Sequence, residues 1–400
     1  LLAFDEAPLE EIAAALGTTA DDIAEGDWYI LTVPSRDGIP ARRARPVSPS
    51  DAVPVKVSGR KLRDRKPLTL RRRYKPRPRI DIAKLRKMLL AMQPREVGVM
   101  DVGQATCNLI YDANGTPQIY VDAGLPTFFN FASLPPAVGG NVQVINPGPC
   151  LGNNPPGIVS HFHWDHYLML WFANNAAALQ NRDWIFPPQG AGPLVAAIIV
   201  GINGRMNGQV HIFPAGLAAL PAGYVTIIQC VPGVGVPPGD LNNTGLAVVA
   251  HLDTANNLDA LLPGDAAFQS IPGLAGYAGL RWMAATHHGS DRHLAPPPPP
   301  LLAPPVPAPN VANQGRLAYS YGINGLVPGG LHCYGHPRAA AVAAYIAAGW
   351  GIGANVAATA ETGPNTNLAG RGNIMVGSNV VPPPCGVANC PFHAFPKTLV

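Results

Sequence analysis

Residues 160–166, with the sequence SHFHWDH, constrain the fold more than any other part of this 400-residue chain. Three histidines and one aspartate fall within six positions, directly after the apolar stretch GIVS. In a turn that leaves a strand, His161 and His163 can point to one side. Asp165 and His166 then project from the first helical turn toward an adjacent position. One short peptide can thus supply ligands to two ions about 3.5 to 4 Å apart, the spacing used to activate water in two-metal hydrolysis.

The sequence from Val97 onward predicts strands connected by turns, because short runs rich in β-branched residues alternate with Gly, Asn and Pro. Such runs are VGVMDV, CNLIYD, QIYVDAG, GIVSH, VTIIQCV, GLAVVAHLD, LDALLPGD, WMAATHH and RLAYSYG. Helices are expected at 166–181, where an apolar face is continuous, and at 338–349, which is rich in Ala and ends in Gly. With 43 Gly, 45 Pro and only 13% charged residues, a bundle of long charged helices is excluded. The pattern predicts an α/β sandwich.

The charges divide the chain into chemically different parts. Residues 1–35 are acidic and helix-like, and we expect a small helical segment there. Residues 36–95 hold 20 Lys and Arg against only four Asp, so this segment repels itself and is expected to be extended. Residues 96–400 hold 8 basic and 12 acidic residues and are expected to form the catalytic domain, with a proline-rich surface loop at 296–309.

The basic segment indicates a nucleic-acid partner, because Lys and Arg release counterions when they neutralise phosphates. A solvated linker, or an arm that docks on a partner protein of a larger complex, explains the same composition. The residues expected to contact phosphates are Arg71, Arg72, Arg73, Lys75, Arg77 and Arg79.

Residues 161–166, HFHWDH, also resemble the His-x-His-x-Asp-His signature of the metallo-β-lactamase superfamily. The resemblance extends in that superfamily's order: QIYVDAG resembles its first acidic motif, LDALLPGDAAF its second, and ATHHGS its last histidine motif. It implies an αββα sandwich, a supporting role for Asp122 and a metal-bridging role for Asp265. It also implies that His287 or His288 is a further ligand.

A narrower resemblance connects residues 97–380 to the soluble hydrolase domain of DNA-uptake competence proteins of the ComEC type. The segments that carry it are VMDVGQATCNLIYD, NNTGLAVVA, THHGS and AYSYGINGLVPGGLHCYGHPRAAAVAAYIAAGW. The resemblance implies hydrolysis of phosphodiester bonds in DNA or RNA. The chain lacks the membrane channel that accompanies such domains, so import is not expected.

The third histidine motif of the superfamily has no clear counterpart between His166 and Asp265. His211 and His251 are candidates, although neither has the usual flanking residues. The narrower resemblance instead aligns Asn243 near that place, which would leave one ion short of a nitrogen ligand. Coordination richer in oxygen favours Mn²⁺ as readily as Zn²⁺.

Asp165 is the candidate for orienting the attacking water, and His336 for stabilising the pentavalent phosphorus or protonating the leaving oxygen. A histidine that only caps the following helix is the alternative for His336. Asn243, Ser290 and Asn324 are candidates for substrate contact. The alternative functions are hydrolysis of a small molecule, such as a lactone, thioester or cyclic nucleotide, and nucleic-acid binding by a subunit with a vestigial site.

The cysteines and the hydropathy bear on the compartment. No stretch approaches the roughly 18 to 20 apolar residues that span a bilayer, so we expect a soluble, cytoplasmic protein without a membrane partner. Six dispersed cysteines fit free thiols in a reducing compartment. Cys385, Cys390 and His393 could form a small metal clip, but ordinary thiols are the favoured interpretation.

Overall fold

The computed structural model describes residues 29–32, 58–61, 82–126, 133–135, 155–174, 176–233, 239–290, 305, 315–322, 336–360, 362–363, 366–367, 371–377 and 397–399. The chain divides into two compact units, Leu1–Pro78 and Arg79–Val400. In the first unit, β1 (Tyr29–Thr32) pairs antiparallel with β2 (Ser58–Lys61). The expected helix in residues 1–35 and the proline-rich loop lie outside the described residues, apart from β1 and Pro305.

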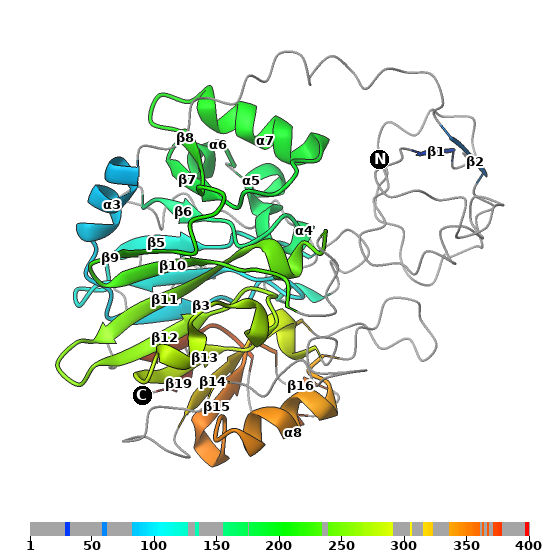
Figure 1. The fold of residues 1–400 in the computed structure, drawn as a ribbon. Coiled ribbons are helices and arrows are strands. Elements are labelled where there is room, and N and C mark those ends of the chain that lie inside the picture. Colours follow the sequence, from blue (N-terminus) through cyan, green and yellow to red (C-terminus); the bar gives the residue numbers. More distant parts are fainter. Residues whose placement is uncertain are drawn as a thin grey trace. The chain divides into compact units, whose positions relative to one another are not determined.

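Two large sheets build the second unit (Figure 1). The eight-stranded sheet has the order β19-β18-β3-β4-β5-β6-β7-β8. Its strands are β3 (Glu96–Val99), β4 (Asn108–Tyr111), β5 (Pro117–Val121), β6 (Gly157–Ile158), β7 (Asp183–Phe186), β8 (Gln209–Ile212), β18 (Ile374–Gly377) and β19 (Lys397–Leu399). The seven-stranded sheet has the order β15-β14-β13-β12-β11-β10-β9. Its strands are β9 (Ala219–Ala222), β10 (Val225–Gln229), β11 (Leu246–Asp253), β12 (Leu258–Leu262), β13 (Leu280–Ala284), β14 (Arg316–Tyr319) and β15 (Val356–Ala358). The expected α/β class is confirmed.

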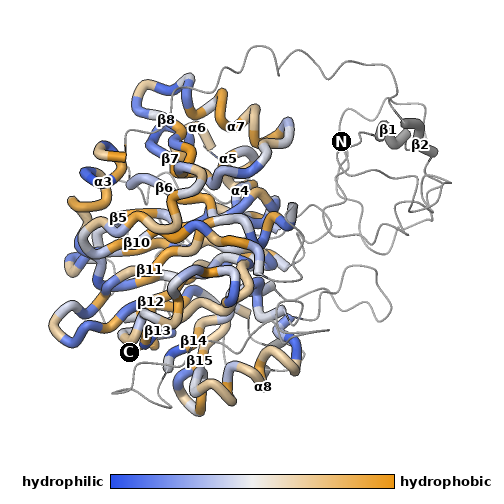
Figure 2. The backbone as a smooth tube through the Cα atoms, in the orientation of Figure 1, coloured by the Kyte–Doolittle hydropathy of each residue, from blue (hydrophilic) through white to orange (hydrophobic). Residues whose placement is uncertain are grey.

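One apolar core joins the two sheets: Ile119 of β5 and Val248 of β11 belong to the same buried cluster. The next residue of β11, Val249, faces the other side of its sheet and packs in a second cluster with Tyr345 of helix α8 (Ala339–Ala347). Strands buried on both faces read as continuous apolar runs, which explains GLAVVA in β11. Figure 2 shows hydrophobic residues along β10 and β11 and hydrophilic residues in the turn after β11.

The helix expected at 166–181 is wrong as a single element. The chain instead forms three short helices, α4 (Trp164–Tyr167), α5 (Met169–Phe172) and α6 (Ala176–Gln180). Ala173 adopts an extended conformation (φ −62°, ψ 151°), which ends α5. Residues 167–170 are all buried, so this part of the segment does not present one apolar face, whereas Trp171 and Ala177 further along are exposed. The helix expected at 338–349 is confirmed as α8.

A helix also corrects the expectation that residues 36–95 are extended throughout. α3 (Ile82–Leu90) buries Leu85 and Leu89 in the core between the sheets, while Lys84 and Lys87 are exposed. Apolar residues three and four positions apart form one helical face, and the basic residues occupy the other. Composition alone concealed this periodicity. Helix α7 (Pro193–Asn203) and the strands β7, β8, β9, β15, β18 and β19 were also not expected from the sequence.

Parallel strand pairs bring the ends of distant segments together. β5 pairs parallel with β6, and β12, β13 and β14 are mutually parallel neighbours. The carboxyl ends of parallel strands lie at the same edge of a sheet, so the loops that follow these strands can meet. Among the described helices, none combines the length and the apolar character that crossing a membrane requires.

Candidate metal centre

The loop after β6 carries the histidine-rich motif, and backbone hydrogen bonds hold it in place. The amide of Thr106 donates to the carbonyl of Asp165 (2.9 Å), and the amide of Ala123 donates to that of His166 (2.8 Å). His161 lies in the turn, with its ring centroid 4.0 Å from that of His166. Local structure therefore matches the strand, turn and helix that the motif predicts.

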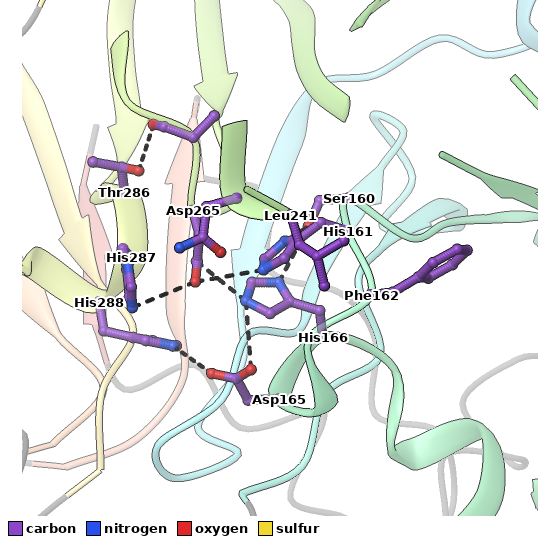
Figure 3. A network of polar contacts seen from close by, with 12 residues as sticks. Ser160, His161, Phe162, Asp165, His166, Leu241, Asp265, Thr286, His287 and His288 are labelled. Carbon is purple, nitrogen blue, oxygen red and sulfur yellow. Dashed lines mark hydrogen bonds and ion pairs between the residues drawn. The ribbon is translucent and has the colours of Figure 1, made fainter. Parts of the chain in front are cut away.

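Asp265, in the turn after β12, lies directly beside this loop (Figure 3). Its Oδ1 is 3.1 Å from Nε2 of His166, and its Oδ2 is 3.7 Å from Nε2 of His161. The side chain is 1% exposed, so these contacts are shielded from water. Asp265 and His166 are 99 residues apart in the sequence. They meet because β6 and β12, which belong to different sheets, end near one another.

His287 and His288 follow β13 in the 3₁₀ turn η10 (Thr286–Gly289). Nε2 of His288 lies 3.1 Å from Oδ2 of Asp165, and its Nδ1 donates to the carbonyl of Ser320 (2.6 Å). Nε2 of His287 lies 3.7 Å from Oδ2 of Asp265. Both histidines therefore reach the cluster, where the sequence left the choice between them open.

Two overlapping groups of side chains could hold divalent ions. One comprises Asp165, His166, Asp265 and His288, the other His161, His163 and Asp265, and in each the ligand atoms lie within 4.8 Å of one another. Among the described residues, neither buried carboxylate oxygen of Asp265 accepts a well-directed hydrogen bond, although Nε2 of His166 lies 3.1 Å from Oδ1. Nε2 of His161, Nε2 of His166 and Nδ1 of His163 are also buried without such a bond. Buried polar atoms without partners are costly, and metal coordination would satisfy all of them together.

Asp122 supports the cluster from behind. It accepts hydrogen bonds from the amide (2.6 Å) and hydroxyl (2.9 Å) of Ser160 and from Nδ1 of His166 (2.8 Å). Because Nδ1 of His166 donates to Asp122, Nε2 is the nitrogen that faces Asp265 and that can bind an ion once its proton is lost. Nδ1 of His161 lies 3.0 Å from the same Ser160 hydroxyl, which directs the second imidazole in the same way.

The electrostatics of the ion-free cluster are dominated by burial and by the carboxylates. Burial disfavours charge on His166, but Asp265, Asp122 and Asp165 outweigh it and raise its pKa well above the usual value. Burial opposes ionisation of Asp265, yet the neighbouring histidines hold its pKa well below the usual value. For His161, burial and the adjacent His166 lower the pKa. The centre thus keeps its carboxylates ionised and ready for cations.

His336 lies beside the cluster, with its ring stacked on that of His288 at 6.0 Å between centroids. Its Nδ1 is 3.1 Å from Nε2 of Gln104, whose Oε1 accepts from the amide of Gly322. The side-chain amide nitrogen can only donate, so Nδ1 of His336 accepts and the proton resides on its Nε2. Burial, with His288 and Arg338 nearby, lowers the pKa of His336 to about 3.

The other predicted residues take different positions. Asn243 belongs to neither metal-binding group: its Nδ2 donates to Asp240 and its Oδ1 accepts from the amide of Ala267, so it ties two loops together. Ser290 is buried at the end of the double-histidine turn, where its amide donates to the carbonyl of His287. Asn324, the six basic residues at 71–79, and Cys385, Cys390 and His393 lie outside the described residues. Burial raises the thiol pKa of the free cysteines Cys107 and Cys230, which suits inert thiols.

His211 and His251, the candidates for the third histidine motif, lie outside both metal-binding groups. Each is instead beside an aspartate of a neighbouring strand: Nε2 of His211 is 3.4 Å from Asp183, and Nδ1 of His251 is 2.5 Å from Asp259. Sequence reasoning missed Gln104 and Ser320, because a glutamine or a backbone carbonyl carries no signal of a partner more than thirty residues away. Ser160, by contrast, could have been found from the sequence, because it stands within the motif SHFHWDH.

In comparisons with known proteins, no family model and no curated protein matches the chain. The geometry of the cluster therefore carries the functional argument.

Proposed function

We propose that the protein is a metal-dependent hydrolase with the αββα sandwich of the metallo-β-lactamase type, and that it cleaves phosphodiester bonds in DNA or RNA. The observation that carries this proposal is the position of Asp265 between two groups of buried histidines and carboxylates, with one of its oxygens directed at His166 and the other at His161. A carboxylate shared in this way suits two neighbouring cations. A metal ion that only stabilises the fold would need a single group of four protein ligands, and the second group would then have no role.

The residues of the two groups would hold two divalent ions, Zn²⁺ or Mn²⁺. Such ions lower the pKa of water toward neutrality and neutralise charge that develops on a phosphoryl oxygen. Asp122 and Ser320 hold His166 and His288 in the orientation that presents Nε2. Asp165 has the most exposed carboxylate of the cluster, with 15% of its side chain accessible, which suits our proposal that it orients the attacking water.

His336 suits hydrogen-bond donation better than protonation of a leaving group. Gln104 donates to its Nδ1, so the neutral ring carries its proton on Nε2. A neutral donor can stabilise negative charge on a phosphoryl oxygen in the transition state. We therefore assign His336 the role of stabilising the pentavalent phosphorus and not that of protonating the leaving oxygen.

Nucleic acid is the proposed substrate because residues 36–95 concentrate 20 of the 28 basic residues of the chain. A hydrolase of small molecules is the second candidate. It is favoured by the acidic balance of residues 96–400, 8 basic against 12 acidic residues, since an acidic unit attracts polyanions weakly.

The deciding experiment incubates the purified protein with end-labelled single- and double-stranded DNA and RNA, with Zn²⁺ or Mn²⁺. Asp165→Asn is the control, because it is nearly isosteric yet removes the charge of a ligand. We expect cleavage by the wild type and a loss of about 10³-fold or more in the variant, since water activation and charge stabilisation each lower the barrier by several kcal/mol. Absence of cleavage with every nucleic acid and metal would transfer the proposal to small-molecule esters.

A further inference from the structure

The two metal-binding groups differ in the number of ligands they offer. Asp165, His166, Asp265 and His288 form a set of four, which is enough for a complete coordination shell. The second group has only three members, and the sequence lacks the histidine that would complete it. His211 and His251 are engaged with aspartates elsewhere, so neither can serve.

His287 occupies the side of Asp265 on which the second group lies. Its Nε2 is 3.7 Å from Oδ2 of Asp265, and Nε2 of His161 is at the same 3.7 Å from that oxygen. Figure 3 shows the two imidazoles approaching this oxygen from His161 and from the turn after β13. Oδ1 of the same carboxylate is directed to His166, in the four-member group.

The two separations from Oδ2 of Asp265 are of the size found between ligands of a shared ion, although in the ion-free cluster His287 is not among the side chains whose ligand atoms all lie within 4.8 Å of one another. A distance of 3.7 Å is too long for a hydrogen bond. Two ligands that each lie about 2.1 Å from one ion at tetrahedral angles are separated by about 3.4 Å. The contacts within the four-member group cover the same range, from 3.1 Å between His166 and Asp265 to 3.8 Å between His166 and Asp165.

The backbone separates the two adjacent histidines. His287 and His288 both adopt left-handed conformations, with φ of 45° and 55°, which residues with a Cβ rarely do. Their rings are inclined by 73° with centroids 6.1 Å apart, so they face different parts of the centre. Ser320 anchors His288 toward Asp165, while the amide of His287 donates to Gly264, next to Asp265. Such strain is typical of functional sites.

We propose that His287 is the fourth protein ligand of the second ion and replaces the absent histidine of the third motif. The inference rests on the proposed two-ion centre and assigns each histidine of the pair to a different ion. One site then has two nitrogen and two oxygen ligands, and the other, built from His161, His163, His287 and Asp265, has three nitrogens and one oxygen. The nitrogen-rich site prefers Zn²⁺, while the other accepts Mn²⁺ as readily.

The test counts ions without measuring activity. Wild type, His287→Ala, His288→Ala and His251→Ala are saturated with Zn²⁺, passed through a desalting column and measured by elemental analysis, and calorimetry gives both affinities. We expect two ions for wild type and for the His251→Ala control. His287→Ala should retain one ion at nearly unchanged affinity and bind the second on the order of 100-fold more weakly. Loss of a residue that only hydrogen-bonds to a ligand already weakens binding about 10- to 100-fold, and loss of the ligand itself should cost at least as much.

Added imidazole provides a second measurement. It should restore the second ion to His287→Ala, because the free ligand can enter the space that the ring leaves, and His287→Gln covers the case in which the alanine variant does not fold. Two tightly bound ions in either folded variant would overturn the inference and leave the proposed function standing. A wild type that binds no ion would overturn both, whereas failure to cleave nucleic acid would leave the ion counts unaffected.

Discussion

Asp122 illustrates, at the scale of single residues, how a side chain outside the two metal-binding groups orients a histidine that belongs to one of them. It is fully buried and holds Ser160 and His166 through three hydrogen bonds. We expect Asp122→Asn to weaken metal binding about 10- to 100-fold, the usual effect of losing a carboxylate behind a ligating histidine. Asparagine tolerates the left-handed backbone at this position (φ 64°), so the fold should survive. Competition with a chromogenic chelator measures the loss, with Asp112→Asn in the β4–β5 turn as a matched control.

Protons and metal ions compete for His166 and His288. Burial disfavours their charged forms, but Asp265 and Asp122 raise the pKa of His166, and the hydrogen bond to Asp165 raises that of His288. Because the raised pKa values favour the protonated rings, metal binding should release protons from them, at most one from each ring. Affinity should rise with pH until the raised pKa values are passed.

Calorimetry in two buffers of different ionisation enthalpy measures the protons released, and a binding enthalpy that does not depend on the buffer would contradict the prediction. The same shifts affect the ion-free fold in the opposite direction. A raised folded-state pKa stabilises the fold below the unfolded value of 6.5, and this contribution is lost as pH rises through the raised pKa.

His336 offers a prediction that separates donation from acid catalysis. His336→Gln retains a side-chain N–H donor, so we expect kcat to fall by less than about 10²-fold, the lower end of general acid–base contributions. His336→Ala should lose more. The pH profiles of kcat for the wild type and for His336→Gln should therefore have the same shape. A limb near neutrality that the substitution removes would instead assign His336 as a general acid.

At the scale of elements, the loop after β5 and the helix α4 meet with no space for a side chain. A Cβ on Gly124 would lie 1.6 Å from the carbonyl oxygen of Asp165 and 2.7 Å from that of Thr106. Both are backbone atoms, so the metal-binding loop would have to move. We expect Gly124→Ala to cost about 1 to 3 kcal/mol of unfolding free energy and to weaken metal binding.

Chemical denaturation and metal titration of Gly124→Ala test this contact together. Gly190→Ala is the control, because a Cβ there meets no atom within 4 Å and its backbone is not left-handed. Equal stability and equal metal affinity of the two variants would show that the α4 loop adapts without loss.

At the scale of the whole molecule, the chain joins a basic segment, residues 36–95, to residues 96–400, which carry the candidate metal centre and are slightly acidic. If the basic segment binds nucleic acid, Arg71→Ala, Arg72→Ala and Arg73→Ala in one variant should weaken binding and lower the slope of log K against log salt by about 0.9 for each lost phosphate contact. Fluorescence anisotropy with labelled DNA at several salt concentrations measures this. A slope unchanged from that of the wild type would assign the segment to a protein partner. As a control, the wild type and the triple variant should contain the same amount of metal.

The sequence by itself determined the local parts: the strand, the turn and the start of a helix around HFHWDH, the runs of the central strands, and α8. These depend on neighbours within a few residues, so periodicity and ligand spacing are sufficient to predict them. It could not determine α3, whose buried Leu85 and Leu89 stand among basic residues, or the division of 166–181 into three helices, because the apolar run gives no sign of the extended conformation of Ala173 that ends α5.

Only the tertiary structure decided which distant side chains meet. Asp265, His287 and His336 reach the centre because parallel strands of two sheets end beside the loop after β6, whereas His211 and His251 were drawn to aspartates on neighbouring strands. A histidine looks the same in sequence in either setting. Its role depends on which carboxylate the fold places within a few ångström of its ring, and that distance is set by the packing of the two sheets.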